Sequence, residues 1–209
     1  MAVVYTVAQQ KGGAGKTMLA ANLAAALARD RRVAVLDIDP QRSLTRWHSI
    51  RNARARPAPP LTCADLSGWR LAAALDRLRR DYDVVLIDSP PQIDTDARLA
   101  VRGADLVLVP VQPSPPDLWA AEATLKLATS ERRPARIVFN RTPATSRLRD
   151  AMLAEIAERR LSTLNTTLGN RSAYAQAFAE GLGVTEASPR SRAAAELIAL
   201  LQEIEGVAA

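Results

Sequence analysis

The chain has 209 residues, of which 48% are hydrophobic and 24% are charged, a composition typical of a soluble globular protein with one sizeable core. No apolar run reaches the roughly 18 residues of a membrane helix, and the N-terminus lacks the pattern of a signal peptide, so we expect a cytoplasmic protein. The single cysteine, Cys63, excludes a disulfide framework within the chain. A net charge of +6 fits either a polyanionic partner such as nucleic acid or a surface of solvated arginines.

Apolar runs alternate with amphipathic or alanine-rich segments along the whole chain. Buried strands are predicted at residues 3–8, 33–37, 84–88, 106–111 and 137–139. Helices are predicted at residues 17–29, 44–50, 71–80, 117–129, 148–160 and 192–205. This alternation predicts an α/β fold in which a mostly parallel, twisted sheet carries helices on both faces, as one domain over residues 1–209. Residues 51–60 are rich in proline and arginine and indicate a flexible connection.

A glycine-rich loop joins the first predicted strand to the first predicted helix. Its sequence is Gln10-Lys11-Gly12-Gly13-Ala14-Gly15-Lys16-Thr17. Glycines allow backbone N–H groups to turn toward phosphate oxygens, and the start of the following helix favours an anion. In this setting we expect Lys16 to reach the β- and γ-phosphates of a nucleotide and Thr17 to bind Mg²⁺ through its hydroxyl. The chain has only three lysines, and two of them, Lys11 and Lys16, lie in this loop.

The loop resembles the deviant Walker A loop of the ParA/MinD family of P-loop ATPases, K-G-G-x-G-K-[ST], because Lys11 precedes the two glycines and Gln10 stands where the general pattern has glycine. The resemblance implies an ATPase with ATP or ADP and Mg²⁺ as cofactors. It also implies a sandwich homodimer that forms with ATP, in which Lys11 touches the phosphates of the partner's nucleotide. The residues expected to bind the nucleotide are Lys11, Gly12, Gly13, Ala14, Gly15, Lys16, Thr17 and Met18, and Lys11 and Lys16 are also expected to serve catalysis.

Two further predicted strands end in aspartates. The segment Asp37-Ile38-Asp39-Pro40-Gln41 resembles the D-x-D-P-Q switch of the family, and Asp88-Ser89-Pro90-Pro91 resembles its Walker B segment. The resemblance implies that Asp39 orients the attacking water, whereas Asp37 either lies near the metal or supports the loop. It also implies that Asp88 holds Mg²⁺ through a water molecule. Thr17, Asp39 and Asp88 are therefore the residues expected near the metal.

Other segments resemble the small ParF-type partition ATPases in particular. By this resemblance, Pro113 lies near the adenine and Asn140 contacts the base. ParA-type proteins bind DNA non-specifically through basic residues of their C-terminal third. The candidates here are Arg147, Arg149 and Arg171, together with Arg190 and Arg192, although each can equally be a solvated surface arginine. Contacts to DNA phosphates need no base readout and weaken strongly with salt.

The resemblance implies a nucleoid-associated ATPase that partitions or positions a cargo, such as a plasmid, a chromosomal locus or a protein assembly, with a ParB-type adaptor as partner. Two alternatives remain open. A MinD-like membrane switch requires a basic amphipathic C-terminal helix, whereas residues 194–205 are acidic, so we expect no membrane partner. A small metabolic enzyme with the same loop would need a small-molecule acceptor. The three tryptophans, Trp47, Trp69 and Trp119, are expected to pack inside the protein.

Overall fold

The computed structural model describes residues 1–66, 68–92, 94–143, 145 and 147–208. Six strands form one sheet in the order β3-β2-β4-β1-β5-β6, and every neighbouring pair is parallel. The strands are β1 (Val3–Val7), β2 (Val33–Asp37), β3 (Thr62–Asp65), β4 (Val84–Asp88), β5 (Leu106–Val111) and β6 (Ala135–Phe139). The predicted α/β fold with a parallel sheet is confirmed.

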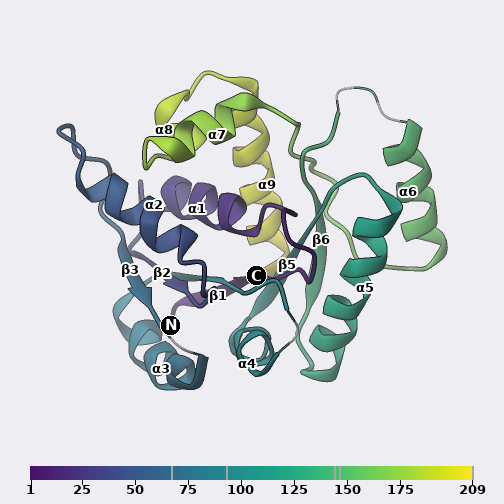
Figure 1. Cartoon of the computed structure of the whole chain (residues 1–209), viewed down its shortest axis with the longest axis horizontal. Coiled ribbons are helices and arrows are strands. Elements are labelled where there is room, and N and C mark those ends of the chain that lie inside the picture. The colour runs from purple at the N-terminus through teal and green to yellow at the C-terminus, as the bar shows by residue number, and fades with distance from the viewer. Residues whose placement is uncertain (67, 93, 144, 146, 209) are drawn as a thin grey trace.

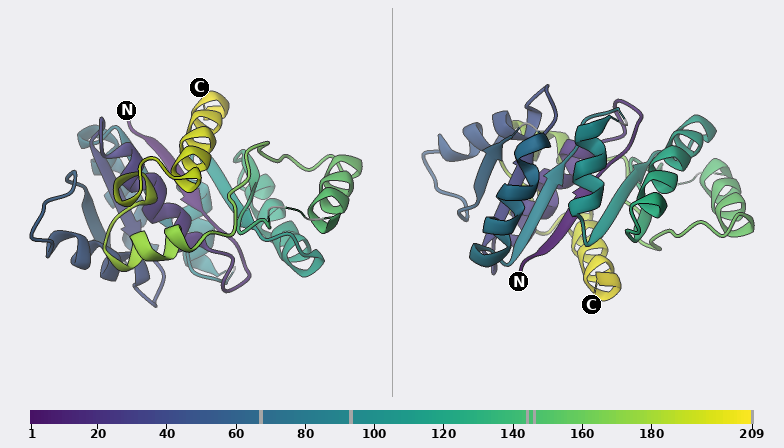
Figure 2. Two further views of the ribbon diagram at one scale, coloured as in Figure 1. Left: turned by 90° about the horizontal axis from the view of Figure 1, so that it is seen from above. Right: turned by 90° about the horizontal axis from the view of Figure 1, so that it is seen from below.

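Helices connect the strands and cover both faces of the sheet (Figure 1). They are α1 (Lys16–Leu27), α2 (Ser43–Asn52), α3 (Leu71–Asp81), α4 (Thr95–Gly103), α5 (Pro115–Ser130), α6 (Arg147–Glu158), α7 (Ser172–Ala179), α8 (Val184–Ala187) and α9 (Arg192–Ala208), with a 3-10 turn, η1 (Gly68–Arg70), before α3. Figure 2 shows α7 and the yellow α9 on one side of the sheet, and α3 and α4 on the other.

Each central strand supplies side chains to two separate cores, because successive residues of a strand point to opposite faces. In β1, Tyr5 and Val7 pack in the core that contains α1 and α9, whereas Val4 packs in the core that contains α3. In β5, Leu108 belongs to the first core and Val109 packs on the α5 side. Burial on both faces explains why these strands are almost continuously apolar instead of alternating.

Helix α1 is the most enclosed helix of the phosphate-loop face. Its side chains Ala20, Ala21, Leu23 and Ala24 are buried on different sides of the helix. Small alanines allow α1 to lie close to the sheet while α7, α8 and α9 cover it from outside (Figure 1). A helix that is apolar all round belongs in a core, and here its burial fixes the position of the glycine-rich loop that precedes it.

The strand order brings the ends of three strands together. Strand β4 lies between β1 and β2, and Asp88 at its end is in register with Val7 of β1 and with Asp37 of β2. The glycine-rich loop leaves β1 at this same edge. In open parallel sheets, ligands bind in the crevice at the carboxyl ends of the strands, so the topology gathers all three predicted motifs in one crevice.

Several elements differ from the sequence prediction. Strand β3 lies in a region where no element was predicted, and α4, α7 and α8 were also not predicted. The packing prediction is right for Trp47, which is buried, and wrong for Trp69 and Trp119, which are 71% and 61% exposed. Within the described residues, none of the helices combines the length and the hydropathy needed to span a bilayer.

Candidate functional site

The glycine-rich loop has a backbone shape that depends on its glycines. Gly13 and Gly15 have φ angles of 79° and 93°, in the left-handed region that favours glycine. A Cβ atom on Gly15 would also lie 2.3 Å from Nδ2 of Asn140. Both the backbone angle and the lack of space therefore exclude a side chain at Gly15. By contrast, a Cβ on Gly12 or Gly13 would meet nothing within 4 Å. The loop therefore packs tightly at Gly15 and faces open space at Gly12 and Gly13.

Side chains from two neighbouring loops hold the carbonyl groups of the glycine-rich loop. Asn140, which follows β6, donates from Nδ2 to the carbonyl of Ala14 at 2.9 Å. Gln112, which follows β5, donates from Nε2 to the carbonyl of Gly13 at 3.0 Å. These bonds fix the orientation of the peptide groups at the bend of the loop. A loop that is held in this way binds an anion without first having to be ordered.

Lys16 lines the cavity at the phosphate loop, and Asp88 is buried close enough to influence it. Lys16 is the first residue of α1 and is 7% exposed, and burial lowers the pKa of its ammonium although Asp88 and Asp39 raise it. Asp88 is fully buried, and neither carboxylate oxygen has a hydrogen-bond partner of ordinary geometry among the described residues. Burial raises the pKa of Asp88 to about 7, against the influence of the nearby Thr17 and Lys16. An unpartnered buried carboxyl group is costly unless a ligand satisfies it.

Asp88 and Thr17 fit the requirements of a bound Mg²⁺. Both offer oxygen atoms, the donor type that Mg²⁺ prefers, and the orphaned oxygens of Asp88 are available to the metal or to a water molecule on it. The described residues contain no group of three or more His, Cys, Asp or Glu side chains that could hold a metal by themselves. A metal here would therefore take its remaining ligands from phosphate oxygens and water, as Mg²⁺ commonly does.

The two aspartates after β2 have different surroundings. The buried carboxylate of Asp37 accepts hydrogen bonds from the backbone N–H and the hydroxyl of Thr45, at 2.8 and 2.9 Å, and from the N–H of Asp39 at 3.2 Å. Of the two roles that the sequence left open for Asp37, its contacts therefore favour support of the loop and of α2. Asp39 instead lines a cavity of about 390 Å³ together with Gly12, Lys16 and Thr17.

A second cavity, of about 400 Å³, adjoins the first. Its lining includes Asn140, Leu168 and Tyr174, and Met18 and Arg141 line both cavities. Asn140, the residue predicted to contact the base, lines this cavity, and both ends of its amide are engaged, because its Oδ1 accepts from the N–H of Arg141 and its Nδ2 donates to the loop. Pro113 lies outside the described lining of both cavities.

Lys11 is bound to a residue of its own chain. Its ammonium forms an ion pair with Asp117 in the first turn of α5, where the Asp117 side chain is 2% exposed and that of Lys11 40%. The Ser114 hydroxyl donates to the same carboxylate oxygen at 2.5 Å. Sequence reasoning did not assign a role to Asp117, Gln112 or Arg141, although each lies within a few residues of the carboxyl end of a predicted strand.

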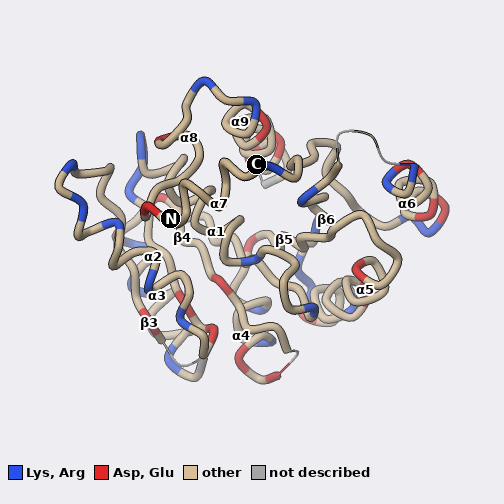
Figure 3. The backbone as a smooth tube through the Cα atoms, turned by 45° about the horizontal axis from the view of Figure 1, so that its top comes forward, with Lys and Arg blue, Asp and Glu red and all other residues tan. Residues whose placement is uncertain are grey.

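The arginines proposed to contact DNA differ in their contacts with carboxylates of the same chain. Arg171 forms two hydrogen bonds with Glu196, from Nε at 2.9 Å and from Nη2 at 2.5 Å, and Arg192 lies 3.5 Å from the same carboxylate. Arg149 pairs with its neighbour Asp150. Arg147, at the start of α6, is exposed. Basic residues are distributed over the whole molecule, with acidic residues among them on α6 and α9 (Figure 3).

Comparisons with known proteins agree with this geometry. The family model described as CobQ/CobB/MinD/ParA nucleotide binding domain matches residues 5–184. The chain is 32% identical over 215 residues to "Maintenance of carboxysome distribution protein A" of Halothiobacillus neapolitanus, with 97% of this chain and 96% of that protein covered. Protein ParA of Rhizobium radiobacter is 30% identical, with 85% and 83% covered. The cell division ATPase MinD of Pyrococcus furiosus matches with a TM-score of 0.81 at 21% identity, over 99% of this chain and 100% of that one, which shows the fold. The chain therefore belongs to the CobQ/CobB/MinD/ParA family of nucleotide-binding proteins.

Proposed function

We propose that the chain is a ParA-like ATPase that forms a dimer with MgATP, binds DNA non-specifically and positions a cargo along it. The observation that supports this proposal most strongly is that Lys16 lines the crevice close to the buried Asp88, whose carboxylate oxygens have no hydrogen-bond partner of ordinary geometry among the described residues. A buried ammonium beside a buried carboxyl group favours a ligand that carries both negative oxygens and a cation. A nucleoside triphosphate with Mg²⁺ has this composition.

The chain's own residues have separate roles in this proposal. The loop of residues 12–17 and the start of α1 bind the phosphates, and Lys16 holds the β- and γ-phosphates. Thr17 and Asp88 would hold Mg²⁺, which would neutralise charge on the phosphate oxygens. Asp39 accepts a hydrogen bond from the attacking water and orients it toward the terminal phosphate. Catalysis is then mainly positioning and electrostatic stabilisation.

Lys11 completes the site of a second subunit in this proposal. Its ammonium is bound to Asp117 in the single chain, so it does not contribute to its own phosphate loop in this position. Release from Asp117 would leave a 40% exposed, flexible side chain at the face that carries the nucleotide. A partner subunit that presents its phosphates to this face would receive the Lys11 ammonium. Dimerisation would then depend on the nucleotide.

The names of the relatives support an ATPase that positions a cargo more than a small metabolic enzyme. A relative that this chain matches over nearly its full length is named for the distribution of carboxysomes, and a further relative, of Myxococcus xanthus, is named a chromosome partitioning protein. The membrane alternative has less support, because the apolar face of α9 is already buried. Leu197, Leu200 and Ile204 of α9 are fully buried in the core, and Arg31 pairs with Glu205 at 2.6 Å. We therefore infer a protein assembly or a DNA locus as cargo, brought by an adaptor protein.

The decisive experiment is a gel shift of duplex DNA by the purified protein with ATP, with ADP and without nucleotide, at two salt concentrations. We expect a shift that requires ATP and weakens as salt rises, because phosphate contacts release counterions. The Lys16→Ala variant is the control, because it should bind neither nucleotide nor DNA. Absence of a shift in every state, together with ATP-dependent pelleting with liposomes, would overturn the proposal in favour of a membrane switch.

A further inference from the structure

Arg141 stands at the junction of the two cavities. It follows β6 directly, it is exposed, and it lines both the cavity at the phosphate loop and the cavity beside α7. The one other residue that lines both cavities is Met18, among the described residues. Any elongated ligand whose two ends occupy the two cavities must pass these two side chains, of which only Arg141 is charged.

The guanidinium of Arg141 is available to such a ligand. Within the described residues it forms no ion pair, whereas the nearby cations Lys11 and Arg171 are both bound to carboxylates. Its contact within the chain is a long hydrogen bond from Nη1 to the carbonyl of Gly13, at 3.4 Å. A hydrogen bond of this length to a neutral carbonyl is weak, and a charged phosphate oxygen would replace it favourably.

The charge around the cavity also favours an additional cation for a polyanionic ligand. The carboxyl group of Asp39 lines the phosphate-loop cavity together with Lys16, so the cavity wall carries an acidic side chain beside the ammonium. With Lys11 held by Asp117, Lys16 is the lysine that remains for the terminal phosphates. A guanidinium at the junction would supply the missing positive charge at the part of the ligand that lies between the two cavities.

We propose that Arg141 is a nucleotide-binding residue that contacts the phosphate nearest the ribose. This inference rests on the proposed function, because it takes the terminal phosphates to lie over residues 12–17 and the base to lie in the second cavity. The contact is to an α-phosphate, which ATP and ADP share. Arg141 should therefore contribute equally to the affinity for both nucleotides, unlike a residue that senses the γ-phosphate.

A purely structural role for Arg141 can be separated from nucleotide binding with a matched control. Gln112 donates to the same carbonyl of Gly13 at the shorter distance of 3.0 Å. If Arg141 acted only by holding the loop, Gln112→Ala would harm nucleotide binding at least as much as Arg141→Gln. If Arg141 contacts the nucleotide, its variant should be the more harmful of the two.

The test is titration calorimetry of ADP and ATP, with Mg²⁺, into the wild type and the variants Arg141→Gln, Arg141→Lys and Gln112→Ala. Loss of a charge-assisted hydrogen bond predicts that Arg141→Gln binds both nucleotides about 10- to 100-fold more weakly, with the same factor for each. Arg141→Lys should lose less, because it keeps the charge, and Gln112→Ala should lose less than Arg141→Gln.

Two results would overturn the inference while leaving the proposed function standing. One is an ADP affinity of Arg141→Gln equal to that of the wild type, and the other is an equal loss in Gln112→Ala. Circular dichroism shows whether Arg141→Gln folds. If it does not fold, either of two results overturns the inference instead: an ADP affinity of Arg141→Ala equal to that of the wild type, or a loss of ADP affinity that is greater in Gln112→Ala than in Arg141→Lys. A wild type that binds neither nucleotide would refute the proposed function itself, and the inference with it.

Discussion

At the scale of single residues, Lys16 and Asp88 are ionisable side chains whose charged forms are disfavoured by burial. Burial is the largest cause of the lowered pKa of Lys16 and of the raised pKa of Asp88. Neither group gains enough from the other to offset its desolvation, since Asp88 retains two unpartnered oxygens. Groups of this kind persist in a fold where a ligand supplies what the chain lacks. Stability and function therefore oppose each other at Asp88.

The variant Asp88→Asn should show that the ionised Asp88 carboxylate lowers the stability of the protein without ligand. In the wild type without ligand, the pKa of the Asp88 carboxyl group is about 7 in the folded chain and near 4 in the unfolded chain. Between these two values the unfolded state binds fewer protons than the folded state. The free energy of unfolding therefore falls as the pH rises from 4 to 7. An amide cannot ionise. Thermal denaturation in EDTA should therefore show Asp88→Asn to be more stable above pH 7, by a few kcal/mol, with the gain vanishing near pH 4.

Asp88→Asn should also no longer be stabilised by MgATP. MgATP is expected to raise the melting temperature of the wild type and to leave that of Asp88→Asn nearly unchanged. Ser89→Ala is a suitable control, because Ser89 is a buried neighbour whose hydroxyl bonds to the carbonyl of Val7. A variant Asp88→Asn that is less stable than the wild type above pH 7, or that still responds to MgATP, would contradict this account.

Asp117 offers a second test at the residue scale, because it holds Lys11 within its own chain. Replacing Asp117 with Asn removes the charge that binds the ammonium and keeps a similar shape. We expect Asp117→Asn to dimerise at a lower ATP concentration than the wild type, measured by light scattering during an ATP titration. Ser114→Ala is the matched control, because it removes the other donor to the same carboxylate and leaves the ion pair. The idea fails if Asp117→Asn needs as much ATP as the wild type, or if it dimerises when Lys11 is also replaced by Ala.

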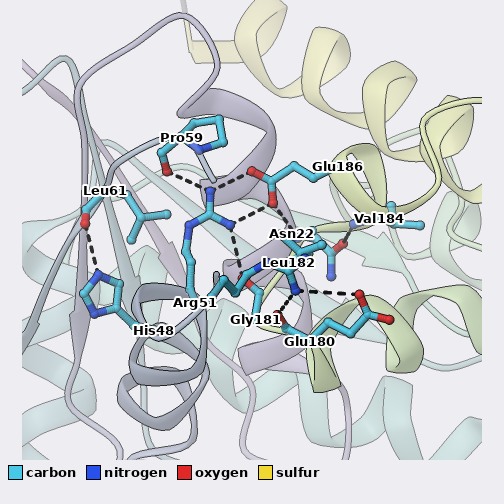
Figure 4. Close-up of polar contacts among 12 residues, drawn as sticks. Asn22, His48, Arg51, Pro59, Leu61, Glu180, Gly181, Leu182, Val184 and Glu186 are labelled. Carbon is cyan, nitrogen blue, oxygen red and sulfur yellow. Dashed lines mark hydrogen bonds and ion pairs between the residues drawn. The ribbon is translucent and has the colours of Figure 1, made fainter. Parts of the chain in front are cut away.

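At the scale of elements, helix α2 joins the switch segment to the outer helices. Its start is held by Asp37 through Thr45, and its other end is anchored to the α7–α8 connection. Trp47 donates to the carbonyl of Leu182, and its ring stacks on Phe178 at 6.2 Å. Arg51 donates to Glu186, to the carbonyl of Gly181 and to that of Pro59 (Figure 4). The helix is thus fixed at both ends.

The ion pair of Arg51 with Glu186 should be important for stability, because both side chains are buried, with 2% and 9% exposed. Removing one partner leaves the other charge buried without compensation. Arg51→Ala should therefore lower the free energy of unfolding by about 3 kcal/mol in urea denaturation. Arg98 is the control, since its ion pair with Glu131 is at the surface, with the Arg98 side chain 56% exposed. Its replacement by Ala should have an effect below about 1 kcal/mol. Equal effects of the two variants would contradict this reading of the pair.

The elements that the sequence predicted are those whose burial is nearly complete. Strands β1, β2, β4 and β5 are apolar runs because both of their faces are covered, and three of them end next to a recognisable motif. Strand β3 is a four-residue edge strand with exposed ends, so its sequence, Thr-Cys-Ala-Asp, carries no clear period. The ion pairs of Lys11 and Arg51 each join residues more than 100 positions apart, and no local pattern indicates such a partner.

At the scale of the whole molecule, the carboxyl edge of the sheet is the face suited to a partner. It carries the open side of the loop at Gly12 and Gly13, the partly exposed Lys11, and Trp119, which is 61% exposed two residues after Asp117. A large exposed aromatic side chain beside a charged site is typical of protein interfaces. The arginines, in contrast, are spread around the molecule (Figure 3), so DNA contacts would come from a surface that two subunits form together.

The oligomeric state in each nucleotide tests this view of the molecule. Light scattering should give the mass of one chain, 22.5 kDa, with ADP and twice that mass with ATP. The wild-type dimer should dissociate as ATP is consumed. Asp39→Ala should bind ATP with wild-type affinity and remain dimeric, because it lacks the carboxylate that we propose orients the attacking water but retains Lys16, Thr17 and Asp88. Gln41→Ala is the control, since Gln41 also lines the cavity and contacts Asp39 only through its backbone N–H. Equal masses in both nucleotides would refute the switch, and equal rates of ATP hydrolysis in the wild type and Asp39→Ala would refute the role of Asp39.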